Sequence, residues 1–232
     1  MLILAIDTAT DRLGLALRRD DTTLAELHLD LGRKHAEKIL VGLDGLLADL
    51  GVAPRDLGGI AVSLGPGSFT GLRIGLAFAK GLALATGAQL VGIPTLTVLA
   101  AGARPWVGLV VPCLDARRSE VYYSAYHLTS GGVEHLDPDF KAGAPADVAA
   151  RCRLLGPRVL LVGTGAEAVH GVAGSDAAVA PREFAFPRAS VLAALGAEKL
   201  RQGEGDALDP LEPLYVRRPD AVIRRDPLST RA

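Results

Sequence analysis

The chain has 232 residues, of which 49% are hydrophobic and 22% are charged. This length and composition fit one large domain or two small ones with a sizeable core. The formal net charge of −1 gives no electrostatic reason to expect the chain to bind nucleic acid on its own. The basic residues after Val216 are a local exception, of the kind found in solvated termini.

Cysteine use and the apolar stretches indicate the compartment. Cys113 and Cys152 lie in unrelated contexts, which argues against a disulfide framework or a cysteine-rich zinc site and favours reduced thiols in a cytosolic protein. The first residues lack a basic region and reach Asp7 after six positions, so we expect no signal peptide. The most apolar stretch, residues 71–86, contains two charged residues and several glycines, so we expect no membrane span.

In the first half, three predicted strands precede an alternation of helices and strands. Apolar runs and alternating patterns predict the strands, and apolar residues at helical spacing predict the helices. The predicted strands cover residues 2–6, 13–17, 23–29, 59–64 and 90–93. The predicted helices cover residues 39–50, 71–86 and 95–101, and Gly51 and Gly87 end the first two.

The second half repeats this order with unrelated residues. Its predicted strands cover residues 106–114, 120–127, 133–136 and 159–162. Its predicted helices cover residues 145–155, a stretch from residue 165, and 189–201. A duplicated βββαβα unit is typical of the actin, Hsp70 and sugar-kinase fold, so we predict an α/β protein with subdomains at residues 1–104 and 105–232. A single doubly wound sheet is the alternative.

Residues 65–75 (GPGSFTGLRIG) form a glycine-rich turn from a strand into a helix. No Gly-Lys-Ser/Thr ends the turn, so it is not a Walker A loop. Its third glycine stands one position too late for a dinucleotide fingerprint, and Pro66 removes an amide donor. Ser68 has no glycine two residues away on either side, so it is not a nucleophile elbow. Two interpretations stay open: an anion at the helix N-terminus, or simple capping by Ser68 or Thr70.

The helix at 71–86 is apolar nearly all round. Small residues recur every four positions, apolar residues occupy both flanks, and only Arg73 and Lys80 are charged. A surface helix has one apolar stripe, so this helix should be buried on two sides. One side covers its own sheet, and the other faces either a second layer of the domain or another molecule.

Carboxylates and hydroxyls follow the first strand of each half. Asp7, Thr8 and Thr10 end the first strand, and Asp115 ends the equivalent strand of the second half. In the predicted fold such residues approach a nucleotide and magnesium across a cleft. They are also ordinary turn residues. The five histidines lack metal-binding spacing, and we expect His35 to lie in an exposed first turn of a helix.

Five segments together resemble the TsaB family, also called YeaZ. They are residues 3–10 (ILAIDTAT), 34–37 (KHAE), 60–75 (IAVSLGPGSFTGLRIG), 115–122 (DARRSEVY) and 213–217 (PLYVR). The resemblance implies the duplicated actin-like fold. It implies a role in placing threonylcarbamoyl on the adenosine next to the anticodon of tRNAs that read codons beginning with A.

The resemblance also implies partners. A TsaB-like chain forms a heterodimer with TsaD, the transferase, joins TsaE in a larger complex, and forms a homodimer when alone. It would be a cytoplasmic scaffold with no catalytic residues, no metal and no required cofactor, and tRNA would contact it only indirectly. The loop and helix after Gly65 would form the interface. The residues expected there are Phe69, Leu72, Arg73, Gly75, Leu76, Ala79, Lys80 and Ala83.

Two other functions remain as alternatives. The first is an autonomous ATPase or phosphotransferase that would hold ATP and magnesium with Asp7, Thr8, Thr10 and Asp115. The second is a glycoprotease-like peptidase, for which the sequence offers no recognisable set of catalytic residues.

Overall fold

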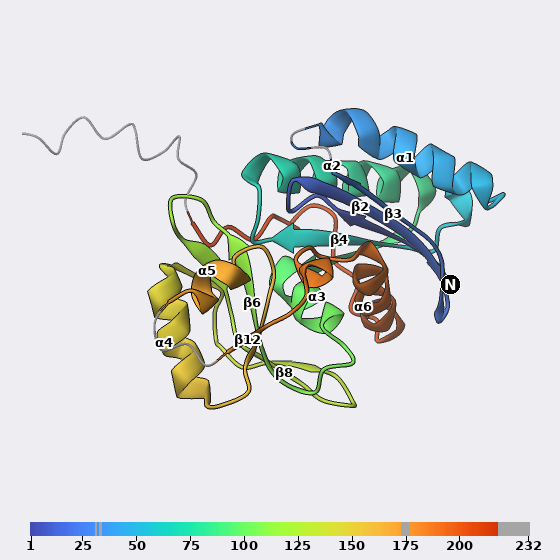
Figure 1. The fold of residues 1–232 in the computed structure, drawn as a ribbon. Coiled ribbons are helices and arrows are strands. Elements are labelled where there is room, and N and C mark those ends of the chain that lie inside the picture. Colours follow the sequence, from blue (N-terminus) through green and yellow to red (C-terminus); the bar gives the residue numbers. More distant parts are fainter. Residues whose placement is uncertain (31, 33, 173–176, 218–232) are drawn as a thin grey trace, which may run out of the picture.

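The computed structural model describes residues 1–232 except 31, 33, 173–176 and 218–232. The predicted basic tail beyond Arg217 therefore lies outside the described residues. Two β-sheets form the body of the molecule (Figure 1). Helices α1 and α2 cover the outer face of the first sheet, and α6 covers its inner face. Helix α3 contacts both sheets, and α4 and α5 cover the far face of the second.

The first sheet has the strand order β3-β2-β1-β4-β5. Strand β1 is antiparallel to β2 and parallel to β4, so the sheet begins as hairpins and continues through helical crossovers. The strands are β1 (Leu2–Asp7), β2 (Arg12–Arg19), β3 (Thr22–Asp30), β4 (Gly59–Gly65) and β5 (Gln89–Pro94).

Two long helices pack on the outer face of this sheet. They are α1 (His35–Asp49) and α2 (Phe69–Thr86). Gly51 and Gly87 follow them with φ values of 62° and 77°, the left-handed conformation that ends many helices. Leucines and isoleucines of β1, β2, β4, α1 and α2 form the core beneath them.

The second sheet has the order β10-β7-β6-β11-β12, and β8 pairs with β6 and β9. Its strands are β6 (Gly108–Asp115), β7 (Val121–Tyr123), β8 (Tyr126–Leu128), β9 (Val133–His135), β10 (Lys141–Gly143), β11 (Leu160–Val162) and β12 (Ala178–Val179). The remaining helices are α3 (Thr95–Gly102), α4 (Pro145–Leu155), α5 (Ala166–His170), α6 (Ala189–Arg201) and the short 3₁₀ turns Pro54–Asp56 and Arg182–Phe184.

The single strand predicted at 120–127 is interrupted. Strands β7 and β8 pair with β6 in one continuous register, which places Pro112 opposite Ser124. A proline has no N–H to give to the ladder, so the pairing stops there. The next amide, that of Ala125, instead donates to the carboxylate of Asp137 at 2.9 Å.

The chain returns to the first sheet after residue 188. The predicted division after residue 104 falls between the two sheets, yet α6 packs on β1, β2 and β4. Residues 206–217, here called the C-terminal strap, then run along the edge strand β5 and on to the end of β4. The Asp206 carboxylate accepts from Gly92 N at 2.7 Å, and Leu214 N donates to Leu64 O at 2.7 Å. The last described part of the chain thus covers an open sheet edge.

No helix in the described part of the chain is both long and apolar enough to cross a membrane.

Candidate functional site

The glycines of the 65–75 segment let α2 sit on the end of β1. A Cβ on Gly67 would overlap the carbonyl of Ala9, and one on Gly71 would overlap the carbonyl of Thr8. A Cβ on Gly75 would overlap the hydroxyl of Thr8, which itself donates to Gly71 O at 2.8 Å. The stripe of small residues therefore faces inward and fixes α2 against its own sheet.

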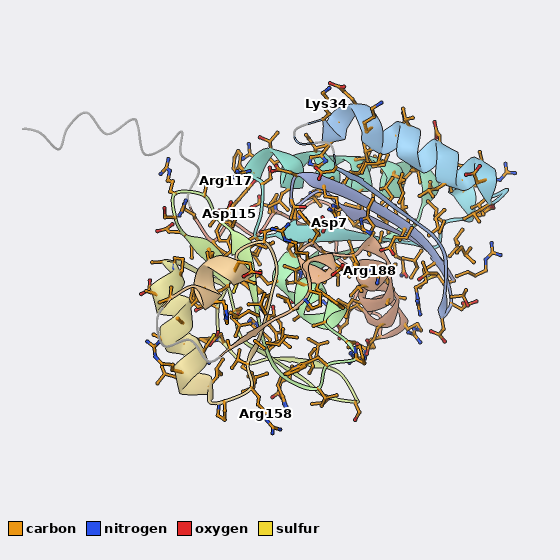
Figure 2. The ribbon with its side chains drawn as sticks, viewed as in Figure 1. Asp7, Lys34, Asp115, Arg117, Arg158 and Arg188 are labelled. Atoms are coloured by element: carbon orange, nitrogen blue, oxygen red, sulfur yellow. The ribbon has the colours of Figure 1, made fainter. Side chains whose placement is uncertain are left out.

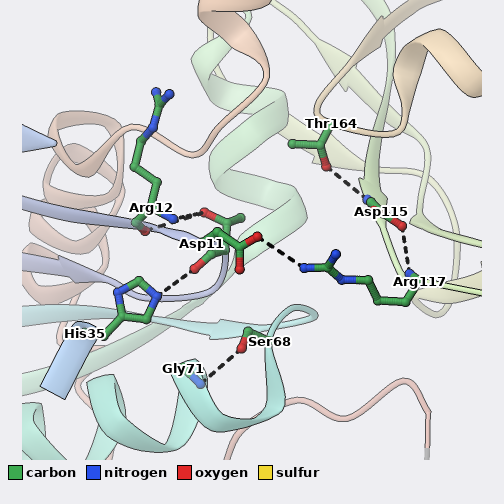
Figure 3. A network of polar contacts seen from close by, with 9 residues as sticks. Asp11, Arg12, His35, Ser68, Gly71, Asp115, Arg117 and Thr164 are labelled. Atoms are coloured by element: carbon green, nitrogen blue, oxygen red, sulfur yellow. Dashed lines mark hydrogen bonds and ion pairs between the residues drawn. The ribbon is translucent and has the colours of Figure 1, made fainter. Parts of the chain in front are cut away.

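The start of α2 is capped by the chain itself. Ser68 Oγ accepts from Gly71 N at 3.2 Å, as the capping interpretation expects (Figure 3). The backbone N–H of Ser68 donates to the carbonyl of Ala9 at 2.7 Å. The turn into α2 is thus tied to the end of β1 from both sides.

Most of the predicted interface residues do not face outward. Five of the eight are buried within the chain itself. The physical reason is the close approach of α2 to Thr8, which turns the small residues and the leucines beside them into the core. The five are Leu72, Gly75, Leu76, Ala79 and Ala83.

The other three predicted interface residues contact the C-terminal strap. The guanidinium of Arg73 lies 3.9 Å from the ring centroid of Phe69, and its Nε donates to the hydroxyl of Tyr215 at 2.8 Å. The rings of Phe69 and Tyr215 lie 5.1 Å apart. Lys80 Nζ donates to the carbonyl of Asp209 at 3.4 Å. The strap therefore covers one flank of α2.

The outward flank of α2, which lies next to the side that the strap covers, is open and apolar. Ala77, Gly81 and Leu84 are exposed, and the Leu84 side chain is 79% exposed. The neighbouring helix α1, which lies beside α2 over the same sheet (Figure 1), exposes Leu40 and Val41. Half-buried Ile74 and Phe78 border this flank. The sequence showed only that two sides of the helix were apolar, and not which of them the strap covers.

A cleft of about 720 Å³ opens beside the N-terminus of α2, between the two sheets. Asp11 and Arg117, which come from different halves, form an ion pair across it at 3.2 Å (Figure 3). On the far wall, Asp115 accepts from Arg117 N at 2.7 Å, and its own N–H donates to Thr164 Oγ1 at 3.0 Å. The strap ends here, where Arg217 pairs with Glu120.

The predicted nucleotide-binding residues separate into two groups. Thr10 and Asp115 line the cleft, but Asp7 and Thr8 do not. Asp7 shares the face of β1 that α6 covers and is 1% exposed, and burial raises its pKa to about 6. This corrects the predicted pairing of Asp7 with Asp115 across the cleft. Alternation along β1 turns the Asp7 carboxylate to the inner face of the sheet. Figure 2 labels Asp7 on the side of the first sheet and Asp115 on the side of the second.

The prediction for His35 is wrong. It begins α1, but it is only 3% exposed, and its Nε2 lies 2.9 Å from the carbonyl of Thr10. The imidazole therefore holds the β1–β2 turn beneath the cleft. Among the described residues, no group of three histidine, cysteine, aspartate or glutamate side chains could hold a metal ion.

Comparisons with known proteins identify the family. The family model of TsaD, tRNA N6-adenosine threonylcarbamoyltransferase, matches residues 29–225. The tRNA threonylcarbamoyladenosine biosynthesis protein TsaB of Bacillus subtilis (strain 168) is 36% identical over 228 residues, which cover 97% of each chain. The chain belongs to the TsaB family. This confirms the resemblance drawn from the sequence.

Solved structures agree with the fold of this TsaB-family chain. YeaZ from Pseudomonas aeruginosa has a TM-score of 0.82 at 29% identity, and the match covers 92% of this chain and 99% of that one. Component A of the (R)-2-hydroxyglutaryl-CoA dehydratase of Acidaminococcus fermentans matches at a TM-score of 0.51 and 12% identity, covering 87% and 99%. These likenesses confirm the predicted actin-like α/β fold.

Proposed function

We propose that this chain is a scaffold subunit in the biosynthesis of tRNA threonylcarbamoyladenosine, and that it docks onto a TsaD transferase through the open flank of α2. The Bacillus relative, which is named for that biosynthesis, supports the pathway. The observation that carries the docking is the open apolar flank of α2 beside the exposed side chains of α1. Monomeric proteins rarely leave such a surface uncovered.

The match to the TsaD family model supports a transferase as the partner. A match over residues 29–225 means that this chain and the transferase share an ancestry and a fold. Related chains can pair through equivalent faces in the way that identical chains do. The same face would then also bind a second copy of this chain when the transferase is absent, and TsaE would join the resulting heterodimer.

The residues of the open flank suit helix-to-helix packing. Ala77 and Gly81 lie four positions apart and carry little or no side chain, so a partner helix can approach closely. Leu84, Phe78 and Ile74 stand beside them and offer apolar area. An interface of standard size buries about 800 Å² on each partner, and α1 extends the surface next to α2.

The experiment compares Leu84→Glu with Leu154→Glu. Both leucines are almost fully exposed, at 79% and 81%, so neither change disturbs the core. Leu84 lies on the open flank of α2, and Leu154 lies on α4, which covers the second sheet. We expect Leu84→Glu to weaken binding to the TsaD of the same organism by about tenfold or more, and Leu154→Glu to leave it unchanged.

Binding by calorimetry and tRNA modification in a reconstituted assay provide the two measurements. The modification rate at limiting subunit concentration should fall with Leu84→Glu and recover when that variant is added in excess. A third variant, Ala77→Arg, places a charge elsewhere on the open flank. If Leu84→Glu, Leu154→Glu and Ala77→Arg all bind TsaD as the wild type does, the docking assignment is wrong.

We also propose that this subunit requires no cofactor of its own. Two of the residues predicted to bind a nucleotide support this, because both already have a place inside the fold. The Asp7 carboxylate is buried under α6, and the Thr8 hydroxyl holds α2. Calorimetry with ATP and magnesium on the isolated chain tests the proposal. Binding tighter than about millimolar would favour the ATPase alternative instead.

A further inference from the structure

The C-terminal strap touches both the docking helix and the cleft. Before it reaches them, the strap lies along the β5 edge and α2, where Leu208 and Leu211 pack on the core under α1 and α2. Its last described residues, 214–217, line the cleft. One continuous segment thus connects the start of α2, on one side of the cleft, to the second sheet on the other side.

At the docking helix, the strap is held by Tyr215. The ring of Tyr215 packs against Phe69 in a tilted arrangement with centroids 5.1 Å apart, and its hydroxyl accepts from Arg73 Nε at 2.8 Å. The guanidinium of Arg73 lies over the Phe69 ring, 3.9 Å from its centroid, and 5.8 Å from the centroid of the Tyr215 ring. All of these contacts are to the first turns of α2.

At the cleft, the strap is held by Arg217. Its guanidinium pairs with Glu120 and also donates to the carbonyl of Ala116 at 3.3 Å. Both partners belong to the turn that joins β6 to β7 in the second sheet. Tyr215 and Arg217, two residues apart, therefore fasten the strap to opposite halves of the molecule.

The turn that Arg217 holds has an unfavourable backbone. Arg117, Arg118 and Ser119 have φ values of 63°, 54° and 58°, a left-handed conformation that residues with a Cβ disfavour. Three such residues in a row persist only where surrounding contacts hold them. These contacts include Arg217 from the strap, the Asp115 carboxylate on Arg117 N, the ion pair of Arg117 with Asp11 across the cleft, and the backbone hydrogen bonds between residues 116, 117 and 120.

We infer that the C-terminal strap couples the docking helix to the cleft. While Tyr215 is bound to α2, Arg217 holds the 117–119 turn in its left-handed conformation. The turn then directs Arg117 toward Asp11. When Tyr215 leaves Phe69 and Arg73, Arg217 loses its fixed position, the turn relaxes, and the bridge across the cleft opens. This goes beyond the proposed function, because it concerns contacts inside the chain and holds whether or not a partner binds.

Hydrogen exchange of the isolated chain tests the coupling. The reporters are the amides of residues 116, 117 and 120, which donate to Glu120 O at 2.9 Å, to the Asp115 carboxylate at 2.7 Å and to Arg117 O at 3.1 Å. The two variants are Arg217→Gln, which removes the ion pair at the turn, and Tyr215→Ala, which removes the contacts to Phe69 and Arg73 and leaves Arg217 in place. Glu212→Gln is the matched control, because Glu212 is an exposed carboxylate on the same strap.

We expect Arg217→Gln and Tyr215→Ala each to speed exchange at the turn by about tenfold, and Glu212→Gln to leave it unchanged. Peptides from β6 and α4 should keep their wild-type rates in all three variants. Faster exchange with Arg217→Gln but not with Tyr215→Ala would overturn the inference, because the turn would then respond only to its own contact. A uniform rise in every peptide would overturn it as well, since the strap would then act on global stability alone.

If Tyr215→Ala fails to fold, Arg73→Gln replaces it, since the exposed Arg73 holds the same hydroxyl.

Discussion

Replacing Asp7 by asparagine should stabilise the protein at neutral pH. The carboxylate of Asp7 lies in one row across the sheet with Gly14 and His28, and Ser63 is its neighbour on β4. Its Oδ1 accepts from Ala9 N at 3.2 Å, while Oδ2 lacks a well-formed hydrogen bond among the described residues and has only the nearby Ser63 hydroxyl to favour its charge. An ionised carboxylate in this place loses its hydration with little compensation, whereas a neutral amide of the same shape does not.

The size of the effect follows from the pKa of Asp7. Burial raises that pKa from 3.8 to about 6, although Ser63, Ala9 and His28 oppose the rise. The folded state therefore holds the proton more tightly than the unfolded state does. Stability is unaffected below about pH 4, falls as the pH rises from about 4 to about 6, and stays reduced above that. A difference of about two pKa units corresponds to about 3 kcal/mol, an upper bound for what Asp7→Asn recovers.

Urea unfolding followed by circular dichroism between pH 4 and pH 8 measures this effect. We expect Asp7→Asn to match the wild type near pH 4 and to gain up to about 3 kcal/mol by pH 7.5. Asp44→Asn, at an exposed position of α1, is the control and should show no such trend, because its carboxylate stays in water. A variant that is less stable than the wild type by the same amount at every pH would refute the reasoning. It would mean that the ionised carboxylate is well solvated in the fold.

Two further predictions concern how helices are seated. Glu26 accepts from Ser190 N at 2.8 Å and from Arg188 at 2.9 Å, so it caps α6 from β3. Glu26→Gln should lower the free energy of unfolding by about 1 kcal/mol in urea titrations, and an unchanged midpoint would refute the cap. Gly75→Ala should cost about 1–3 kcal/mol because the methyl group meets the Thr8 hydroxyl. In a Thr8→Ala background the same change should cost much less, and a double-mutant cycle without coupling would contradict the contact.

Local patterns predicted most of the strands and helices. Helix α4 and helix α6 begin and end at the predicted residues, because their apolar spacing and their flanking residues agree. The break in the strand at 120–127 depended on Pro112 standing opposite Ser124, a register that appears only once the sheet is assembled. Strands β10 and β12 have three and two residues, too few to show a period.

The candidate site was harder to predict because its residues depend on long-range packing. The sequence identified α2 and the turn before it. Which flank of α2 stays open depends on the strap, which covers the other one. The strap lies about 130 residues further along the chain, as the contact between Lys80 and Asp209 shows. His35 was expected in water because first turns of helices are usually exposed. Its burial follows from the β1–β2 turn folding over it, with Thr10 as its partner.

The glycine segment at 65–75 connects these observations. A glycine-rich turn into a helix leaves space around its backbone, which proteins often use to hold an anion. In this chain, the carbonyls of Thr8 and Ala9 and the hydroxyl of Thr8 occupy that space. Because internal contacts fill the turn, α2 has a fixed position before any ligand or partner arrives. A rigid, apolar flank loses little conformational entropy on binding. Under the proposed function, the residues that resemble a phosphate loop would therefore serve to present a preformed surface for docking.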